Sequence, residues 1–172
     1  MKSILALLVI GACVATPCSF AAERFKSDKP TPLERLPYKQ EDGNGVRFGS
    51  SVQLSGQFLI VAKTAKKPEY WQITFYPDAG SAALLPHPAD EKPGAELDFT
   101  NREQAAAMLH DLVTLEKQLP RGETASAGTA TVTIRNFRTE VECDHRYYLA
   151  ELVSVAKDKP MVAALRDAHP GC

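Results

Sequence analysis

The sequence has no excess of charge of either sign and no hydrophobic run long enough to cross a membrane. Its 20 Lys and Arg residues are nearly balanced by 21 Asp and Glu residues, so the overall charge gives no reason to bind nucleic acid or anionic lipid. The longest apolar run, residues 4–12, is far shorter than the roughly 20 residues that a spanning helix needs. We therefore expect no membrane span and no nucleic-acid partner.

Signatures of the common catalytic sites are also missing. The sequence contains no G-x-S-x-G, H-E-x-x-H, P-loop or G-x-G-x-x-G pattern, which excludes the best-known hydrolase, metalloprotease and nucleotide-binding arrangements. Two pairs of carboxylates alternate along expected strands, namely Glu96/Asp98 and Glu140/Glu142. A charged solvent face explains these pairs more simply than an acid–base site does. We expect no enzyme, no cofactor and no metal.

The first 21 residues have the parts of a secretory signal. Lys2 supplies a positive charge, residues 4–12 are apolar, and small residues precede a cleavage point after Ala21 or Ala22. This pattern predicts a protein exported to the periplasm or beyond it. A competing interpretation is that the residues ending at Cys13 form a lipobox, which would make the protein an outer-membrane lipoprotein anchored through that cysteine.

Cysteine is scarce, and only Cys143 and Cys172 remain once the signal is removed. Two cysteines in an oxidising compartment predict one disulfide bond. Closing a loop of about 30 residues is worth roughly 3–4 kcal/mol in the chain-entropy model. The same cysteines with His145 and His169 would also make a zinc ligand set, but the disulfide needs no metal and is the interpretation that we favour.

After the signal, the sequence divides into an arm and one domain. Residues 22–45 are polar, contain three prolines and end in a Gly-rich stretch, which is typical of an extended N-terminal arm without packed elements. Residues 46–172 are of ordinary size for a single domain. Periodicity of two predicts strands in this domain, followed by a short helix over 161–169; the strands are at 51–63, 70–76, 82–85, 96–99, 129–143 and 147–156.

A long helix is expected over residues 101–119. Thr100 and Glu103 have the spacing of a capping box, and Pro120 follows the last periodic position. The expected buried face repeats at steps of three and four and consists of Ala105, Met108, Leu112, Leu115 and Leu119. In the strand over 129–143, the parity of the apolar positions changes near Asn136, which indicates a bulge.

The order of strand, strand, short strand, helix, strand, strand resembles the OB-fold. That fold is a five-stranded, partly open antiparallel barrel with one helix between strands three and four, so the implied class is α+β. The elements that carry the resemblance are the strand around Gly56, the helix after Thr100 and the last two strands. The chain resembles small exported bacterial OB-like proteins in this respect.

Four tyrosines are the candidate contact residues: Tyr70, Tyr76, Tyr147 and Tyr148. They lie in two strands whose hairpins echo each other in sequence, and they would serve either as binding surface or as ordinary core. We expect a non-enzymatic exported protein that binds another protein, as an inhibitor or immunity-type factor does. The alternatives are a small-ligand or glycan-binding OB module and a hydrolase built from scattered carboxylates.

Overall fold

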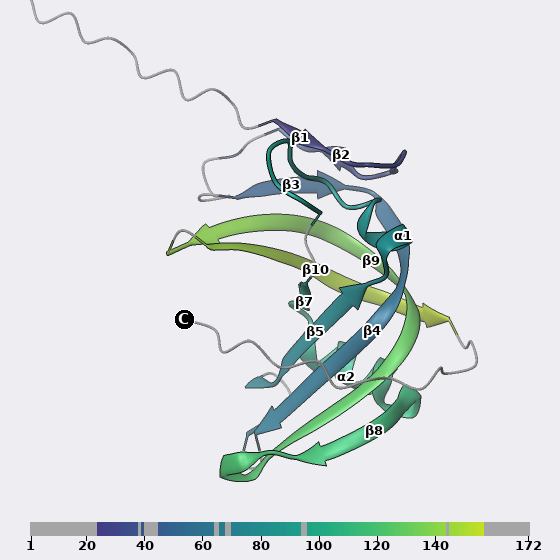
Figure 1. Ribbon diagram of the computed structural model, residues 1–172, viewed down its shortest axis with the longest axis vertical. Coiled ribbons are helices and arrows are strands. Elements are labelled where there is room, and N and C mark those ends of the chain that lie inside the picture. Colours follow the sequence, from purple (N-terminus) through teal and green to yellow (C-terminus); the bar gives the residue numbers. More distant parts are fainter. Residues whose placement is uncertain are drawn as a thin grey trace, which may run out of the picture.

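The computed structural model describes most of the chain after the expected signal. The described residues are 24–37, 39, 45–63, 66–67, 70–93, 96–143 and 145–156. The predicted signal peptide, the lipobox cysteine Cys13 and the predicted helix over 161–169 lie outside this part of the chain. The structure is mostly β, and its strands curve around one core (Figure 1).

Five strands form a closed ring. They are β4 (Ser51–Lys63), β5 (Gln72–Pro77), β7 (Leu97–Phe99), β9 (Glu123–Glu142) and β10 (His145–Ala156). Each strand is hydrogen-bonded to the next in the order β4-β5-β7-β10-β9, and β9 pairs with β4 again. The β7–β10 pair is parallel and the other pairs are antiparallel. The ring is not a regular barrel, and β9 also pairs with strands outside it.

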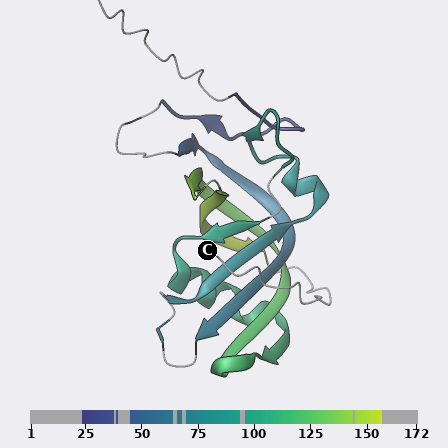
Figure 2. The ribbon, with the colours of Figure 1, turned by 60° about the vertical axis from the view of Figure 1, so that its left-hand side comes forward.

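The remaining elements extend or cover the ring. They are β1 (Phe25–Lys26), β2 (Glu34–Arg35), β3 (Val46–Gly49), β6 (His87–Pro88), β8 (Val113–Gln118), α1 (Ala79–Ala82), α2 (Arg102–Leu109) and the 3₁₀ turns η3 (His110–Leu112) and η4 (Pro120–Gly122). β3 and then β2 continue the sheet beyond β9, while β1 pairs with β6 in a small separate sheet. Figure 2 shows these short strands at the end of the molecule opposite β8.

β9 is bent where its partner changes. Asn136 adopts a left-handed backbone with φ of 52°. The register with β10 shifts there, from Leu149 opposite Arg138 to Glu151 opposite Arg135. β9 pairs with β4 as far as Arg135 and with β3 from Arg138 onward. The bulge predicted near Asn136 is therefore confirmed.

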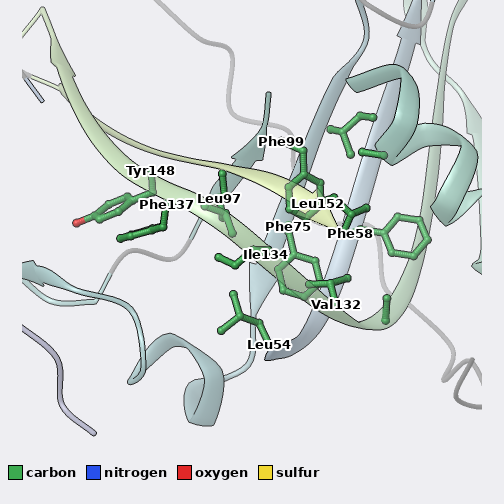
Figure 3. Packing of buried hydrophobic residues seen from close by; sticks show 14 of the residues in the cluster. Leu54, Phe58, Phe75, Leu97, Phe99, Val132, Ile134, Phe137, Tyr148 and Leu152 are labelled. Atoms are coloured by element: carbon green, nitrogen blue, oxygen red, sulfur yellow. The ribbon is translucent and has the colours of Figure 1, made fainter. Parts of the chain in front are cut away.

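The core is the inside of the ring. Alternate residues of β4, β5, β9 and β10 point inward, as strand geometry requires, and pack with β7 and α2 (Figure 3). Phe75 is fully buried, and its ring centroid lies 6.0 Å from that of Phe99. A second, smaller group, here called the outer cluster, consists of Leu59, Val61, Tyr76, Ala125 and Ala127.

The predicted helix over 101–119 is wrong in its second half. The α-helix ends at Leu109, and residues 113–118 form the strand β8 along the first half of β9. Met108, expected in the core, is 40% exposed, whereas its neighbour Leu109 is fully buried. Residues 123–128, which precede the strand expected over 129–143, form the start of β9 and offer β8 a free edge. Pairing with that edge provides hydrogen-bond partners for the backbone of residues 113–118. This gain outweighs the weak helical preference of the segment.

The predicted capping box is also wrong. The residue that precedes α2 is Asn101, and its side chain makes no cap hydrogen bond. Instead, Asn101 Nδ2 donates to the Leu152 carbonyl at 2.8 Å, and Asn101 Oδ1 accepts from the Leu152 amide at 2.9 Å. Thr100 Oγ1 donates to the Ala150 carbonyl at 3.2 Å. These hydrogen bonds link the start of α2 to β10. A pattern of neighbouring residues in the sequence cannot indicate such a distant contact.

The N-terminal segment is more ordered than the expected arm. It contributes β1 and β2, buries Leu33, and places the Phe25 ring 5.5 Å from that of Phe48. The apolar residues spaced among its prolines explain this packing. A second difference is that residues 79–82 form a short helix in place of the strand expected over 82–85, with Asp78 accepting from the Ser81 amide at 2.7 Å.

Candidate functional site

Two pairs of adjacent aromatic residues lie near the starts of β5 and β10, the second strands of the β4–β5 and β9–β10 hairpins. The first pair comes just before β5, and the second pair is in β10. In the first pair, Trp71 packs against the main core and Tyr70 is 59% exposed. In the second pair, Tyr148 is buried and stacks on Phe137, with centroids 6.2 Å apart, whereas Tyr147 is half-buried. Figure 3 shows Tyr148 and Phe137 side by side. Each pair therefore presents one ring to the core and one outward.

The connection that carries Tyr70 is held in place by local contacts. The Lys66 ammonium lies 5.7 Å from the centroid of the Tyr70 ring, within the range of a cation–π interaction. Trp71 Nε1 donates to the Lys66 carbonyl at 3.1 Å, and the Tyr70 amide donates to the Lys67 carbonyl at 2.9 Å. An exposed ring on such a connection loses little conformational freedom when it binds a partner.

Tyr147 lies on an outward surface with mixed charge. Its ring meets that of His145 edge to face, with centroids 4.8 Å apart. Across the ladder, Tyr147 is opposite Glu140 and His145 is opposite Glu142. Arg138 Nε donates to Glu140 Oε1 at 2.7 Å on the same strand. An aromatic ring bordered by charges of both signs is typical of a protein-binding surface.

The structure does not bring the four candidate tyrosines together. Tyr76 belongs to the outer cluster and Tyr148 to the main core, so both are buried. Tyr70 and Tyr147 face outward at separate places. In Figure 1 the end of β4 and the start of β5 are at the lower left of the ring, and the end of β9 and the start of β10 are at the left above them. A surface that used both rings would have to extend from one hairpin to the other.

Asp98 lies in β7 with Glu96 just before it, and Glu140 and Glu142 lie in β9. Burial raises the pKa of Asp98 above its usual value. The hydrogen bond from Thr74 Oγ1 at 2.6 Å and the charge of Arg102 both lower this pKa, but their effect is smaller. Glu140 is paired with Arg138. Within the part of the chain that the structure describes, no three His, Cys, Asp or Glu side chains are grouped to hold a metal ion.

One pair of ionisable groups was missed by sequence reasoning. His87 is 1% exposed, and its Nε2 lies 3.4 Å from Asp28 Oδ1. Its Nδ1 is 2.9 Å from the Pro88 carbonyl oxygen, which only accepts, so Nδ1 is the donor in this hydrogen bond. The pair connects β6 with the segment after β1. Asp28 lies far away in the sequence, in a segment expected to be unpacked, so no local signal indicated it.

The predicted disulfide involves one described and one undescribed residue. Cys143 is an exposed free cysteine next to the β9–β10 turn, with a left-handed φ of 50°, and Cys172 lies outside the described residues. We predict that alkylation of the unfolded, unreduced protein will label neither thiol, and that labelling after reduction will add two groups to the mass. Labelling of both thiols before reduction would contradict the disulfide.

None of the described helices is long and apolar enough to cross a membrane. Comparison of the chain with protein-family models, with curated proteins and with solved structures found no match.

Proposed function

We propose that this chain is an exported OB-type binding protein that contacts another protein through its outward-facing tyrosines. Two features support the OB-type architecture. The ring contains five strands, and α2 lies between its third and fourth strands in chain order, which is the arrangement expected for that fold. Export is supported by the signal-like pattern in residues 1–21.

The observation that carries the binding function is the exposure of the Tyr70 ring just before β5. Most large apolar side chains in the described part of the chain are buried, and Tyr70 is the most exposed of the exceptions. A tyrosine ring offers a large, stiff contact surface with a polar tip. The Lys66 ammonium lies over the Tyr70 ring, which is nevertheless 59% exposed, and Trp71 Nε1 donates to the Lys66 carbonyl. Tyr147 supplies a second outward ring on the other hairpin.

The proposal predicts that Tyr70→Ala and Tyr147→Ala will each weaken partner binding by roughly tenfold or more, equivalent to about 1.4 kcal/mol. Neither change should lower the melting temperature much, because neither ring belongs to a buried cluster. The measurement is capture of partners from the periplasm by the immobilised wild-type protein, identification by mass spectrometry, and titration of the purified partner against each variant.

Val153→Ala is the matched control, because Val153 is also an exposed apolar residue but lies at the other end of β10. It should bind like the wild type. Equal weakening by all three variants, or full binding by both tyrosine variants, would contradict the assigned surface. Specific binding to an array of glycans, with no protein captured, would favour the small-ligand alternative, in which Tyr70 stacks on a sugar ring.

A further inference from the structure

The connection between β4 and β5 has an excess of cations. It includes Lys63, Lys66 and Lys67, against one acid, Glu69. All three lysine side chains are exposed. The composition of the chain hides this excess, because the formal net charge of the whole sequence is −1. The surface at the end of β4 is therefore more positive than the overall charge indicates.

A fourth lysine comes from the adjacent hairpin. Lys117 of β8 is opposite Ala125 of β9, which is itself opposite Val61 of β4. Lys63 comes two residues after Val61, so alternation places Lys63 and Lys117 on the same face of the sheet. Lys117 is also exposed, and β4 and β8 end at the same side of the molecule (Figure 1). We call the four lysines the basic end.

The carboxylates of the chain neutralise the basic end only weakly. Among the described residues, Lys63 alone of the four lysines has an acidic partner, Glu123 Oε1 at 3.8 Å. By contrast, the arginines of β9 and β10 that form ion pairs with glutamates do so at 2.7–3.4 Å; they are Arg135, Arg138 and Arg146. Lysines without a nearby carboxylate can pair with the acids of another molecule.

The exposed Tyr70 ring belongs to the same surface. The Lys66 ammonium lies 5.7 Å from the centre of this ring. The Lys66 amide donates to the Lys63 carbonyl and the Tyr70 amide to the Lys67 carbonyl, both at 2.9 Å. These two successive turns bring three cations close to one exposed ring. An aromatic residue bordered by cations is complementary to an apolar spot bordered by carboxylates.

We propose that the basic end docks on an acidic patch of the protein partner, with Tyr70 packed at its centre and the lysines paired with carboxylates around it. This inference rests on the proposed function and adds the charge of the partner's surface. Four lysines match a few carboxylates, whereas proteins that bind nucleic acid typically neutralise roughly 6–10 phosphates. The rest of the chain has a net negative charge, which would repel an extended polyanion.

The test compares two double variants that change the net charge equally. Lys66→Gln/Lys67→Gln removes two cations of the basic end. The matched control Lys26→Gln/Lys92→Gln removes two exposed lysines in β1 and just after β6, at the other end of the molecule. The ligand is the protein captured from the periplasm by the immobilised wild type and then purified. Surface plasmon resonance gives its association and dissociation rate constants.

Electrostatic attraction acts mainly on association. Lys66→Gln/Lys67→Gln should therefore lower the association rate constant roughly three- to tenfold in about 0.01 M salt, with a smaller change in dissociation. Salt at about 0.15 M shortens the Debye length from about 30 to 8 Å, so it should reduce this difference. The control should associate like the wild type. Equal slowing by both variants, or wild-type association that does not respond to salt, would overturn the proposal.

A zero-length cross-link locates the contact. A carbodiimide joins a lysine to a carboxylate at ion-pair distance, so mass spectrometry should find Lys66 or Lys67 linked to an Asp or Glu of the captured protein. The Lys63–Glu123 pair supplies an internal reference. The reference link without a link to the captured protein would count against the acidic patch. So would tighter binding of a short DNA duplex or of phosphatidylglycerol vesicles than of the captured protein, because the basic end would then recognise phosphates.

Tyr70→Ala separates this inference from the proposed function. If Tyr70→Ala weakens binding while Lys66→Gln/Lys67→Gln binds like the wild type at both salt concentrations, the tyrosine surface is supported and the acidic partner is wrong. If no protein is captured, or if Tyr70→Ala and Tyr147→Ala both bind fully, the proposed function and this inference are both wrong.

Discussion

Phe75→Ala should lower the free energy of unfolding by about 3–5 kcal/mol, the usual cost of removing a buried aromatic ring. Phe75 is at the centre of β5, is fully buried, and packs near Phe99 of the adjacent strand β7. Removing the ring would leave a cavity between the sheet and α2 that rigid neighbouring strands cannot close. Urea denaturation followed by circular dichroism gives the change through the linear extrapolation.

Tyr70→Ala is the control for this prediction. It removes an aromatic side chain of similar size from the same hairpin, but this ring is mostly exposed. Its effect on stability should stay within about 0.5 kcal/mol. If Phe75→Ala and Tyr70→Ala destabilise equally, the inward face of β5 has been assigned wrongly.

Gly56→Ala should also destabilise strongly, near or above the upper end of the roughly 1–3 kcal/mol that overpacking costs. A methyl group at Gly56 would lie 2.2 Å from the Tyr76 carbonyl oxygen and 2.9 Å from the Pro77 Cα. Both atoms belong to the backbone of β5, which pairs with β4 from Gly56 onward. Relief of the clash would require the two strands to separate at the point where their ladder begins.

Gly80→Ala is the matched control, because the same chemical change there meets a side-chain atom, not backbone, and needs a shift of only a few tenths of an ångström. The nearest atom to the added methyl group would be Asp78 Oδ1 at 3.3 Å, the end of a side chain. Gly80 is in α1, where alanine has the better helix propensity. Gly80→Ala should therefore change the free energy of unfolding much less than Gly56→Ala does. A similar loss of stability in both variants would mean that the close approach of the β5 backbone to Gly56 is not what destabilises Gly56→Ala.

The strands with a clear alternation of apolar residues could be predicted from the sequence. β4 occupies residues 51–63 as predicted, and the irregularity at Asn136 follows from the parity change in β9. These features depend on local pattern, which survives in the fold because one side of each strand faces the core. The order of strands around one helix was sufficient to predict a barrel-like α+β arrangement, and the structure is mostly β.

The elements that depend on distant partners could not be predicted in the same way. Residues 113–118 become a strand because the first half of β9 is beside them, and Asn101 acts on Leu152 rather than on its own helix. The same limit applies to the candidate site. Alternation indicates that adjacent tyrosines face opposite ways, but only the packing of Phe137 assigns Tyr148 to the core and Tyr147 to the outside.

The ring is closed through a very short strand. β7 has three residues, of which Asp98 pairs with both Thr74 of β5 and Leu149 of β10. If β7 detached, the long strands β5 and β10 would each expose a row of unpaired backbone groups, and such edges accept strands from other chains. This seam is therefore the place where amide hydrogen exchange should begin. It is also where two copies would exchange strands if the protein were stressed by heat.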